Sequence, residues 1–181
     1  ELYRLGSPAD SVNALVVNAV DGEGHPASYS RVGPVLHSFT KPDVAYFGGD
    51  SDEACLTWAN KSEHYSHGTS YAAPWIARKL AYLIEIIGLS KEAAKALIID
   101  SASRWGHQGD SRLIGHGVVP THINDILQCP DDEIRLIVSG VAGPNKTSNF
   151  DIPVPKSKGR QPYYGKATLC YFPSCTRSQG V

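Results

Sequence analysis

The chain of 181 residues is 41% hydrophobic and 19% charged and carries a net charge of −1, which suits a soluble globular protein that can bury a core. The balanced charge offers no basic surface of the kind that nucleic-acid binding requires. Its longest apolar stretch contains Arg78, Lys79 and Glu85, so the sequence predicts no membrane span, and no signal-peptide pattern opens the chain.

The first half of the chain alternates strand and helix patterns. The run from Ala14 to Ala19 is apolar except for Asn18, which is typical of a parallel strand buried on both faces. Such alternation predicts an α/β fold for residues 1–129.

A long helix is predicted to begin near Thr69 and Ser70. Pro74 falls within its first turn, where a missing N–H costs little, and Gly88 follows the last apolar residue as the expected C′ position. Apolar residues recur at steps of three and four, with Ala81 and Ile86 widening the apolar face. The recurring positions are Ala73, Ile76, Ala77, Leu80, Leu83, Ile84 and Ile87. We therefore expect a helix that is largely buried in the full-length protein and partly exposed in this chain.

The pattern changes after Cys129, where helical periodicity stops. Alternating runs there are typical of strands, with glycines between them as turns. The runs are 134–138, 150–154 and 167–172. Residues 130–181 are therefore predicted to form a small antiparallel β module appended to the first domain, and the sequence leaves open whether that module is truncated.

Ser70 stands at the head of the predicted helix. A hydroxyl at this point lies among unpaired backbone N–H groups and at the positive end of the helix dipole, which favours an anion forming beside it. Ser70 is thus placed like a nucleophile whose own backbone supplies an oxyanion donor. Alternatively, Thr69 or Ser70 is only the N-cap of the helix, the commoner role of a serine at a helix start.

The string Gly68-Thr69-Ser70-Tyr71-Ala72-Ala73-Pro74 resembles the serine motif G-T-S-x-A-x-P of the subtilisin-like serine proteases (subtilases, peptidase family S8). The resemblance covers about residues 6–127 and implies the C-terminal portion of the family's parallel-sheet catalytic domain. Four flanking segments extend the resemblance. Residues 12–34 resemble a strand, turn and strand that lead to a Ser-x-x-Gly-Pro loop, and residues 40–49 resemble the next strand. Residues 89–105 resemble an amphipathic helix, and residues 115–117 a late Gly-x-Gly turn.

The resemblance implies that Ser70 is the catalytic nucleophile of a serine endopeptidase and forms an acyl-enzyme with a peptide or protein substrate. The other motif residues would support it: Thr69, which follows Gly68, would shape the turn, Ala72 would let the helix pack closely, and Pro74 would fix the first turn. Core packing is the alternative role for these residues.

The loop Gly6-Ser7-Pro8-Ala9 is similar to a loop that forms part of the family's substrate pocket, so we expect these four residues to bind substrate. This chemistry requires neither a metal nor another cofactor, and the sequence contains no Asp/Asn-rich loop that would suggest calcium.

The other catalytic groups of a subtilase are missing from the chain. No Asp-Ser-Gly or Asp-Thr-Gly tripeptide occurs, no Gly-Asn precedes the serine, and His67 lies on the same turn as Ser70, too close in the chain to act as its base. The remaining histidines, expected to be solvated, are His25, His37, His64, His107, His116 and His122. We therefore expect the aspartate, histidine and oxyanion asparagine upstream, outside this chain, which alone would be inactive.

Two other functions compete with this interpretation. Gly68-x-Ser70-x-Ala72 loosely fits the nucleophile elbow of α/β-hydrolases, but that elbow follows a hydrophobic strand, and the residues preceding Ser70 are polar. A catalytically dead subtilase scaffold whose β module binds a partner protein is the second rival. The intact serine motif argues against decay, since a scaffold would not need the hydroxyl.

Four cysteines, Cys55, Cys129, Cys170 and Cys175, have no metal-like spacing with the histidines. Free thiols are the default interpretation over a Cys170–Cys175 disulfide, and unpaired cysteines favour a cytoplasmic setting, although secretion stays open. Without the upstream half of its sheet, the chain would expose apolar surface, so we expect dimerisation, strand exchange or association with that half.

Overall fold

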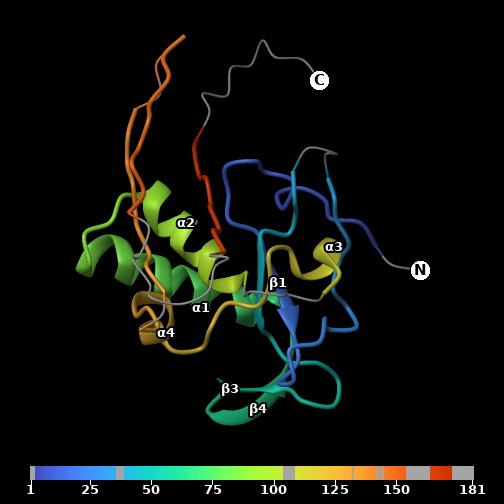
Figure 1. Cartoon of the computed structure of the whole chain (residues 1–181). Helices are drawn as coiled ribbons and strands as arrows, with labels where there is room; N and C mark the ends of the chain where they lie inside the picture. Colours follow the sequence, from blue (N-terminus) through green and yellow to red (C-terminus); the bar gives the residue numbers. More distant parts are fainter. Residues whose placement is uncertain are drawn as a thin grey trace.

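A computed structural model describes residues 3–35, 39–103, 109–131, 133–141, 143, 145–153 and 164–172 (Figure 1). Strands β1 (Val17–Val20) and β2 (Val44–Phe47) pair in parallel, and β3 (Cys55–Ala59) and β4 (Ser62–Ser66) form an antiparallel hairpin. The helices are α1 (Thr69–Ala81), the π-helix η1 (Tyr82–Ile86), α2 (Lys91–Ala102), α3 (Ser111–Ile114) and α4 (Ile123–Leu127). None of the described helices combines the length and apolar character needed to cross a membrane.

Strands β1 and β2 confirm the predicted parallel sheet, with Val17 opposite Val44 and Val20 opposite Phe47. Alternate side chains of β2 enter different cores because successive strand residues point to opposite faces. Val44 and Tyr46 pack with residues of α1 and α2, whereas Ala45 packs with Val20 and with Ile114 of α3. Helices therefore cover both faces of this small sheet, as parallel sheets require.

The two edges of the parallel sheet differ. Beyond β2, the Ala45 N–H donates to the Gly117 carbonyl at 2.8 Å and the Val119 N–H donates to the Ala45 carbonyl at 3.0 Å, so the predicted Gly-x-Gly turn leads into a short parallel extension. Beyond β1, the Ala27 N–H donates to the Ala19 carbonyl at 3.0 Å. No described segment pairs with Val17 on that outer edge, which is therefore open.

A buried ion cluster fixes where the two strands begin. The Asp43 carboxylate accepts hydrogen bonds from Lys41 Nζ at 2.6 Å and from the Val16 N–H at 2.7 Å, and Lys95 Nζ lies 3.9 Å from its other oxygen. Both lysines also donate to the Ala14 carbonyl. The cluster thus ties the chain before β1, the chain before β2 and helix α2 together.

The long helix begins and ends near the predicted residues. α1 starts at Thr69 and continues through η1, and the Leu89 N–H donates to the Leu83 carbonyl beside Gly88, whose φ of +81° confirms the predicted C′ position. Pro74, however, lies in the second turn of α1 rather than the first. Because a helical N–H bonds the carbonyl four residues before it, Pro74 leaves the Ser70 carbonyl without its usual donor.

The helix is only partly buried in the described structure, as expected for a chain without the upstream half of its sheet. Its buried residues form one stripe along the helix: Ala72, Ile76, Lys79 and Leu83. Ile76 and Leu83 are fully buried by other residues of this chain. The opposite side is exposed, including Ala73, Trp75, Ala77, Ile86 and Ile87, while Leu80 and Ile84 are half-buried. The physical reason is that the described part of the chain supplies a sheet for one side of the helix and no element for the other.

The described residues after Asp131 contain no helix or strand, so the strands predicted at 134–138 and 167–172 are absent, while the run 150–154 lies partly outside the described residues. Instead, side chains anchor this region to α2. Lys166 Nζ lies 3.1 Å from the Asp100 carboxylate and donates to the Ser103 carbonyl at 2.6 Å, and Arg135 Nε lies 3.6 Å from the same carboxylate. In Figure 1 the segment 164–172 runs beside α2. The boundary at residue 130 remains a prediction.

Candidate active site

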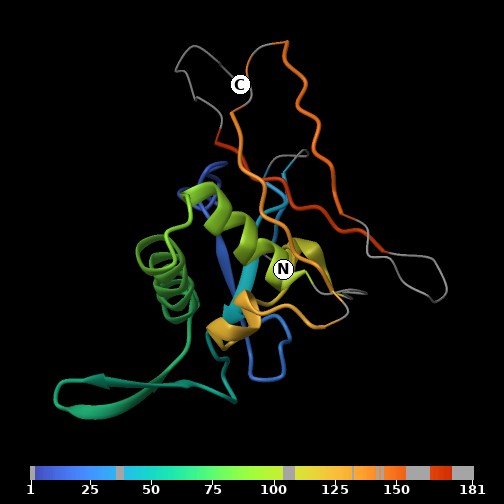
Figure 2. The ribbon, with the colours of Figure 1, turned by 60° about the vertical axis from the view of Figure 1, so that its left-hand side comes forward.

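The turn before Ser70 is built by the β3–β4 hairpin, which projects from the rest of the molecule (Figure 2). Its own turn contains Asn60 and Lys61, both with positive φ, the geometry of tight hairpins. At the end of β4 the Gly68 N–H donates to the Gly48 carbonyl at 2.9 Å, which joins the hairpin to the end of β2. Gly68 has a φ of +154°, a conformation that side-chain-bearing residues rarely adopt. The hairpin and Gly68 together set the direction in which the chain enters α1.

Ser70 is the second residue of α1 and is exposed. The N-cap is Gly68, which has no side chain, and no side chain makes a capping hydrogen bond at this helix start. The structure therefore contradicts the alternative in which Thr69 or Ser70 serves as the cap. The Ser70 N–H has no backbone acceptor among the described residues, and the first turn contains no acidic residue that would offset the positive end of the helix dipole.

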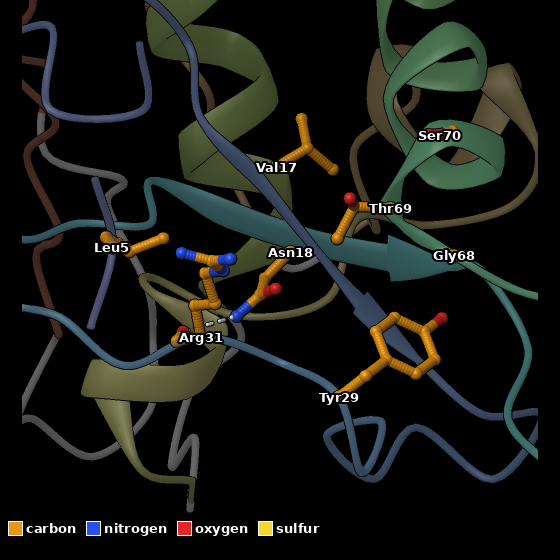
Figure 3. A pocket seen from close by; sticks show the side chains of 8 residues that line it. All are labelled: Leu5, Val17, Asn18, Tyr29, Arg31, Gly68, Thr69 and Ser70. Atoms are coloured by element: carbon orange, nitrogen blue, oxygen red, sulfur yellow. Dashed lines mark hydrogen bonds between the residues drawn. The ribbon is translucent and has the colours of Figure 1, made fainter. Parts of the chain in front are cut away.

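A cavity of about 300 Å³ lies beside Ser70 (Figure 3). Leu5, Val17, Asn18, Tyr29 and Arg31 line it together with the Gly68–Ser70 turn. The residues come from the segment that precedes β1, from the open edge of β1, from the segment that follows β1 and from the helix start. The cavity therefore forms where the parallel sheet lacks a neighbour on its β1 side.

Asn18 is the polar residue in the apolar run of β1, and it is buried at 2% exposure. Its side-chain amide donates to the Arg31 carbonyl at 3.0 Å and to the Leu113 carbonyl at 2.8 Å. A side-chain amide has only two hydrogens to donate, so both are engaged. Asn18 therefore braces the cavity wall and is not free to supply the missing oxyanion donor.

Tyr29, which lines the cavity, forms a stacked aromatic pair with His67, with ring centroids 5.2 Å apart. The Tyr29 hydroxyl donates to the Gly49 carbonyl at 2.7 Å. Burial, followed by the nearby Asp50 charge, raises the pKa of Tyr29 to about 12, so the phenol stays neutral. His67 is held against Tyr29, and its exclusion as the catalytic base stays a prediction.

Among the described residues, no histidine forms a hydrogen bond with Ser70. His25 lies within 3.5 Å of Asp21, and His64 is 2.9 Å from the Ser62 hydroxyl in the exposed hairpin. His37 and His107 are outside the described residues. No group of three His, Cys, Asp or Glu side chains that could hold a metal occurs in the described part of the chain.

The predicted substrate loop is only partly associated with the cavity. Gly6, Ser7 and Pro8 are exposed and Ala9 is half-buried, and none of these residues lines the cavity, although the preceding residue, Leu5, does. Their substrate-binding role stays a prediction. Motif residue Ala72 is buried at 0% exposure against the core, which fits close helix packing.

Sequence reasoning missed the other cavity residues, Leu5, Val17, Asn18, Tyr29 and Arg31. One signal was available: Asn18 interrupts an otherwise apolar buried strand, and a buried amide needs partners. The hairpin was also missed. Strand β4 does precede the serine, but it is an exposed arm and not the buried sheet strand of an α/β-hydrolase elbow.

The free cysteines of the described residues are Cys55, Cys129 and Cys170, while Cys175 lies outside them. Burial raises the pKa of the Cys170 thiol, and burial likewise raises that of Cys55. Thiols with raised pKa values are poor nucleophiles at neutral pH, so neither competes with Ser70 for that role.

Comparison with known proteins identifies the family of this chain. The sequence pattern of the Subtilase family matches residues 1–117. Subtilisin-like proteases 2 and 1 of Pseudogymnoascus destructans are 39% and 38% identical over 106 and 110 residues, covering 59% of this chain and 25% of each relative. The chain thus spans about a quarter of the length of the curated relatives it matches.

The fold of this chain matches part of a solved protease structure. The epidermin leader peptide processing serine protease of Staphylococcus aureus superimposes with a TM-score of 0.58 at 23% identity, covering 68% of this chain and 33% of that protein. A second structure of that protease gives the same TM-score at 22% identity.

Proposed function

Because this chain belongs to the subtilase family, we propose that it is the C-terminal portion of a serine endopeptidase whose nucleophile is Ser70. The observation that carries the proposal is the position of Ser70: an exposed hydroxyl in the first turn of α1, beside a cavity and without a capping role. A serine that does not stabilise its own helix start is free for chemistry.

In the proposed mechanism, Ser70 Oγ attacks the carbonyl carbon of a peptide bond while a histidine takes its proton. The oxygen of the tetrahedral intermediate accepts a hydrogen bond from the Ser70 N–H, and an asparagine amide supplies a second one. The histidine then protonates the leaving amine, an acyl-enzyme remains on Ser70, and water hydrolyses it. Removing one oxyanion donor typically lowers kcat by ~10²–10³.

The histidine, its orienting aspartate and the asparagine would come from the upstream half of the catalytic domain. The open outer edge of β1 at Val17 supports this view, since a parallel strand with an unpaired edge and a cavity beside it can accept a neighbouring strand. The same half would cover the exposed side of α1 and η1. A cytoplasmic location is part of the proposal and rests only on the unpaired cysteines.

Replacing Ser70 by alanine in the full-length protein that carries this chain tests the nucleophile. We expect kcat for peptide hydrolysis to fall by about 10⁶, as in triad knockouts, because no other group can form the acyl-enzyme. The free energy of unfolding should change by less than about 1 kcal/mol, because Ser70 makes no capping bond. Ser66→Ala, four residues earlier, is the matched control and should keep its activity. Retained turnover in folded Ser70→Ala protein would refute the assignment.

The chain of 181 residues alone should not react with a fluorophosphonate, which labels activated serines. Without a histidine within hydrogen-bond reach, the Ser70 hydroxyl is a weak nucleophile. Mass spectrometry of the chain after treatment measures the label. Stoichiometric modification of Ser70 would show that the activating base lies within this chain, contrary to the proposal.

A further inference from the structure

We propose that Asn60 is the acceptor of an N-linked glycan, held at the end of the β3–β4 hairpin. The inference goes beyond the proposed function and does not depend on it, because a glycan acceptor needs no nucleophilic serine. It starts from the sequence Asn60-Lys61-Ser62, which fits the acceptor pattern Asn-x-Ser/Thr with a residue other than proline in the middle. One other stretch of the chain, Asn145-Lys146-Thr147, fits the same pattern.

The hairpin turn presents Asn60 to solvent. Ala59 pairs with Ser62, so the turn consists of only two residues, Asn60 and Lys61, with φ of +49° and +63°. Asn60, Lys61 and Ser62 are all exposed, and the Asn60 side chain forms no hydrogen bond with any described residue. The amide nitrogen can therefore carry a substituent without breaking any contact of the described structure.

The end of the hairpin also has room for a bulky group. The hairpin is a sheet of its own, and it projects from the rest of the described structure (Figure 2). The upstream half proposed above would pair at Val17, which belongs to the other sheet. The acceptor sequence is read in the extended chain during synthesis, before either half of the domain has packed, so recognition of Asn60 does not depend on what lies beside the folded hairpin.

A tight turn alone explains only part of this arrangement. Asparagine is favoured where φ is positive, so Asn60 by itself would mark no more than a hairpin turn. The turn makes no demand on Ser62, whose hydroxyl makes only exposed contacts, donating to the Ala59 carbonyl at 3.3 Å and lying 2.9 Å from His64 Nε2. Asn145 repeats the combination, because it is exposed, has a φ of +58° and precedes a threonine by two positions. An exposed turn asparagine with a hydroxyl two residues later is what a glycan acceptor requires.

The modification is a group transfer from a lipid-linked oligosaccharide diphosphate, catalysed by the oligosaccharide transferase of the cell. A bond forms between Asn60 Nδ2 and the anomeric carbon of the first sugar, and the bond from that carbon to the diphosphate oxygen breaks. A proton passes from Nδ2 to a base of the transferase, and the lipid diphosphate leaves. Because N-linked glycans belong to secreted proteins, the acceptor sequence points to the secretory pathway, against the cytoplasmic location that rests only on the unpaired cysteines.

The test uses the full-length protein with its own N-terminus, produced in a eukaryotic cell. Peptide-N-glycosidase removes the glycan and converts its asparagine into aspartate, which mass spectrometry of the peptide containing Asn60 detects, with an untreated sample as the control for spontaneous deamidation. We expect this conversion at Asn60 and its complete loss in Ser62→Ala, which leaves Asn60 and the turn in place. Ser62→Thr retains a hydroxyl at the required position and should keep the glycan. Ser66→Ala, on the same strand, is the matched control and should also keep it.

The outcomes separate this inference from the proposed function. An Asn60 that stays unmodified in folded protein from the cells or the medium would overturn the inference, as would a glycan that survives Ser62→Ala, and neither result bears on the role of Ser70. A glycan at Asn60 would support the inference and refute the cytoplasmic location. Peptidase activity is measured on the same sample, and glycosylated protein that cleaves no peptide would refute the protease proposal and leave the inference standing.

Discussion

Asp43→Asn should be one of the most destabilising single substitutions in this domain. The side chains of Lys41, Asp43 and Lys95 are exposed by only 3%, 9% and 10%, so two ammonium groups that water barely reaches share this carboxylate as their counter-ion. The neutral amide leaves both charges buried without compensation and can no longer accept charge-assisted bonds from Lys41 and the Val16 N–H. Breaking a buried ion pair from one side typically costs ~3–5 kcal/mol, a large part of the 5–15 kcal/mol by which domains are stable.

Urea unfolding of the full-length protein, followed by tryptophan fluorescence, measures this loss as a shift of the transition midpoint at constant slope. Asp52→Asn is the matched control, because Asp52 is an exposed aspartate nearby in the sequence, and its unfolding curve should coincide with that of the parent. A change below about 1 kcal/mol for Asp43→Asn would refute the reasoning. It would mean that the cluster is hydrated or that the two lysines find other partners.

Two further results are expected. Burial, with the Asp50 charge second, raises the pKa of Tyr29 to about 12 from about 10 in an unfolded chain, so its contribution to stability is complete below pH 10 and is lost as pH rises toward 12; Tyr29→Phe should flatten this part of the stability curve, and an unchanged curve would contradict the burial argument. The chain of 181 residues should self-associate in light scattering through Trp75, Tyr82, Ile86 and Ile87, and Ile86→Lys should weaken association, whereas a monodisperse parent chain would rule it out.

Local features were predictable because they depend on neighbours in the chain. The parallel strand around Val17 follows from an apolar run, the end of the long helix from Gly88, and the start of the helix from the position of Ser70. Each of these signals lies within a few residues of the feature that it predicts. The family resemblance added the role of the serine, which no periodicity could supply.

Patterns that need a partner were less reliable. The periodicity of the helix correctly predicts the burial of Ile76 and Leu83. It does not say what covers the remaining apolar residues, and Ile86 and Ile87 are exposed. Alternation after Cys129 suggested strands, but a strand exists only when a second one pairs with it, and the described residues there pair with none. The described residues of this region are instead held against α2 by the ion pairs of Lys166 and Arg135 with Asp100.

The sequence by itself determined the serine motif, the helix that carries it and the family to which the chain belongs. Only the tertiary structure decided that Ser70 is not a cap, that Asn18 has both amide hydrogens engaged and that Arg31 shares a cavity with the nucleophile. These facts join residues that are tens of positions apart, and their geometry depends on how β1 packs against the start of α1. No pattern within one segment encodes that packing, because it is settled by the burial of side chains from both segments at once.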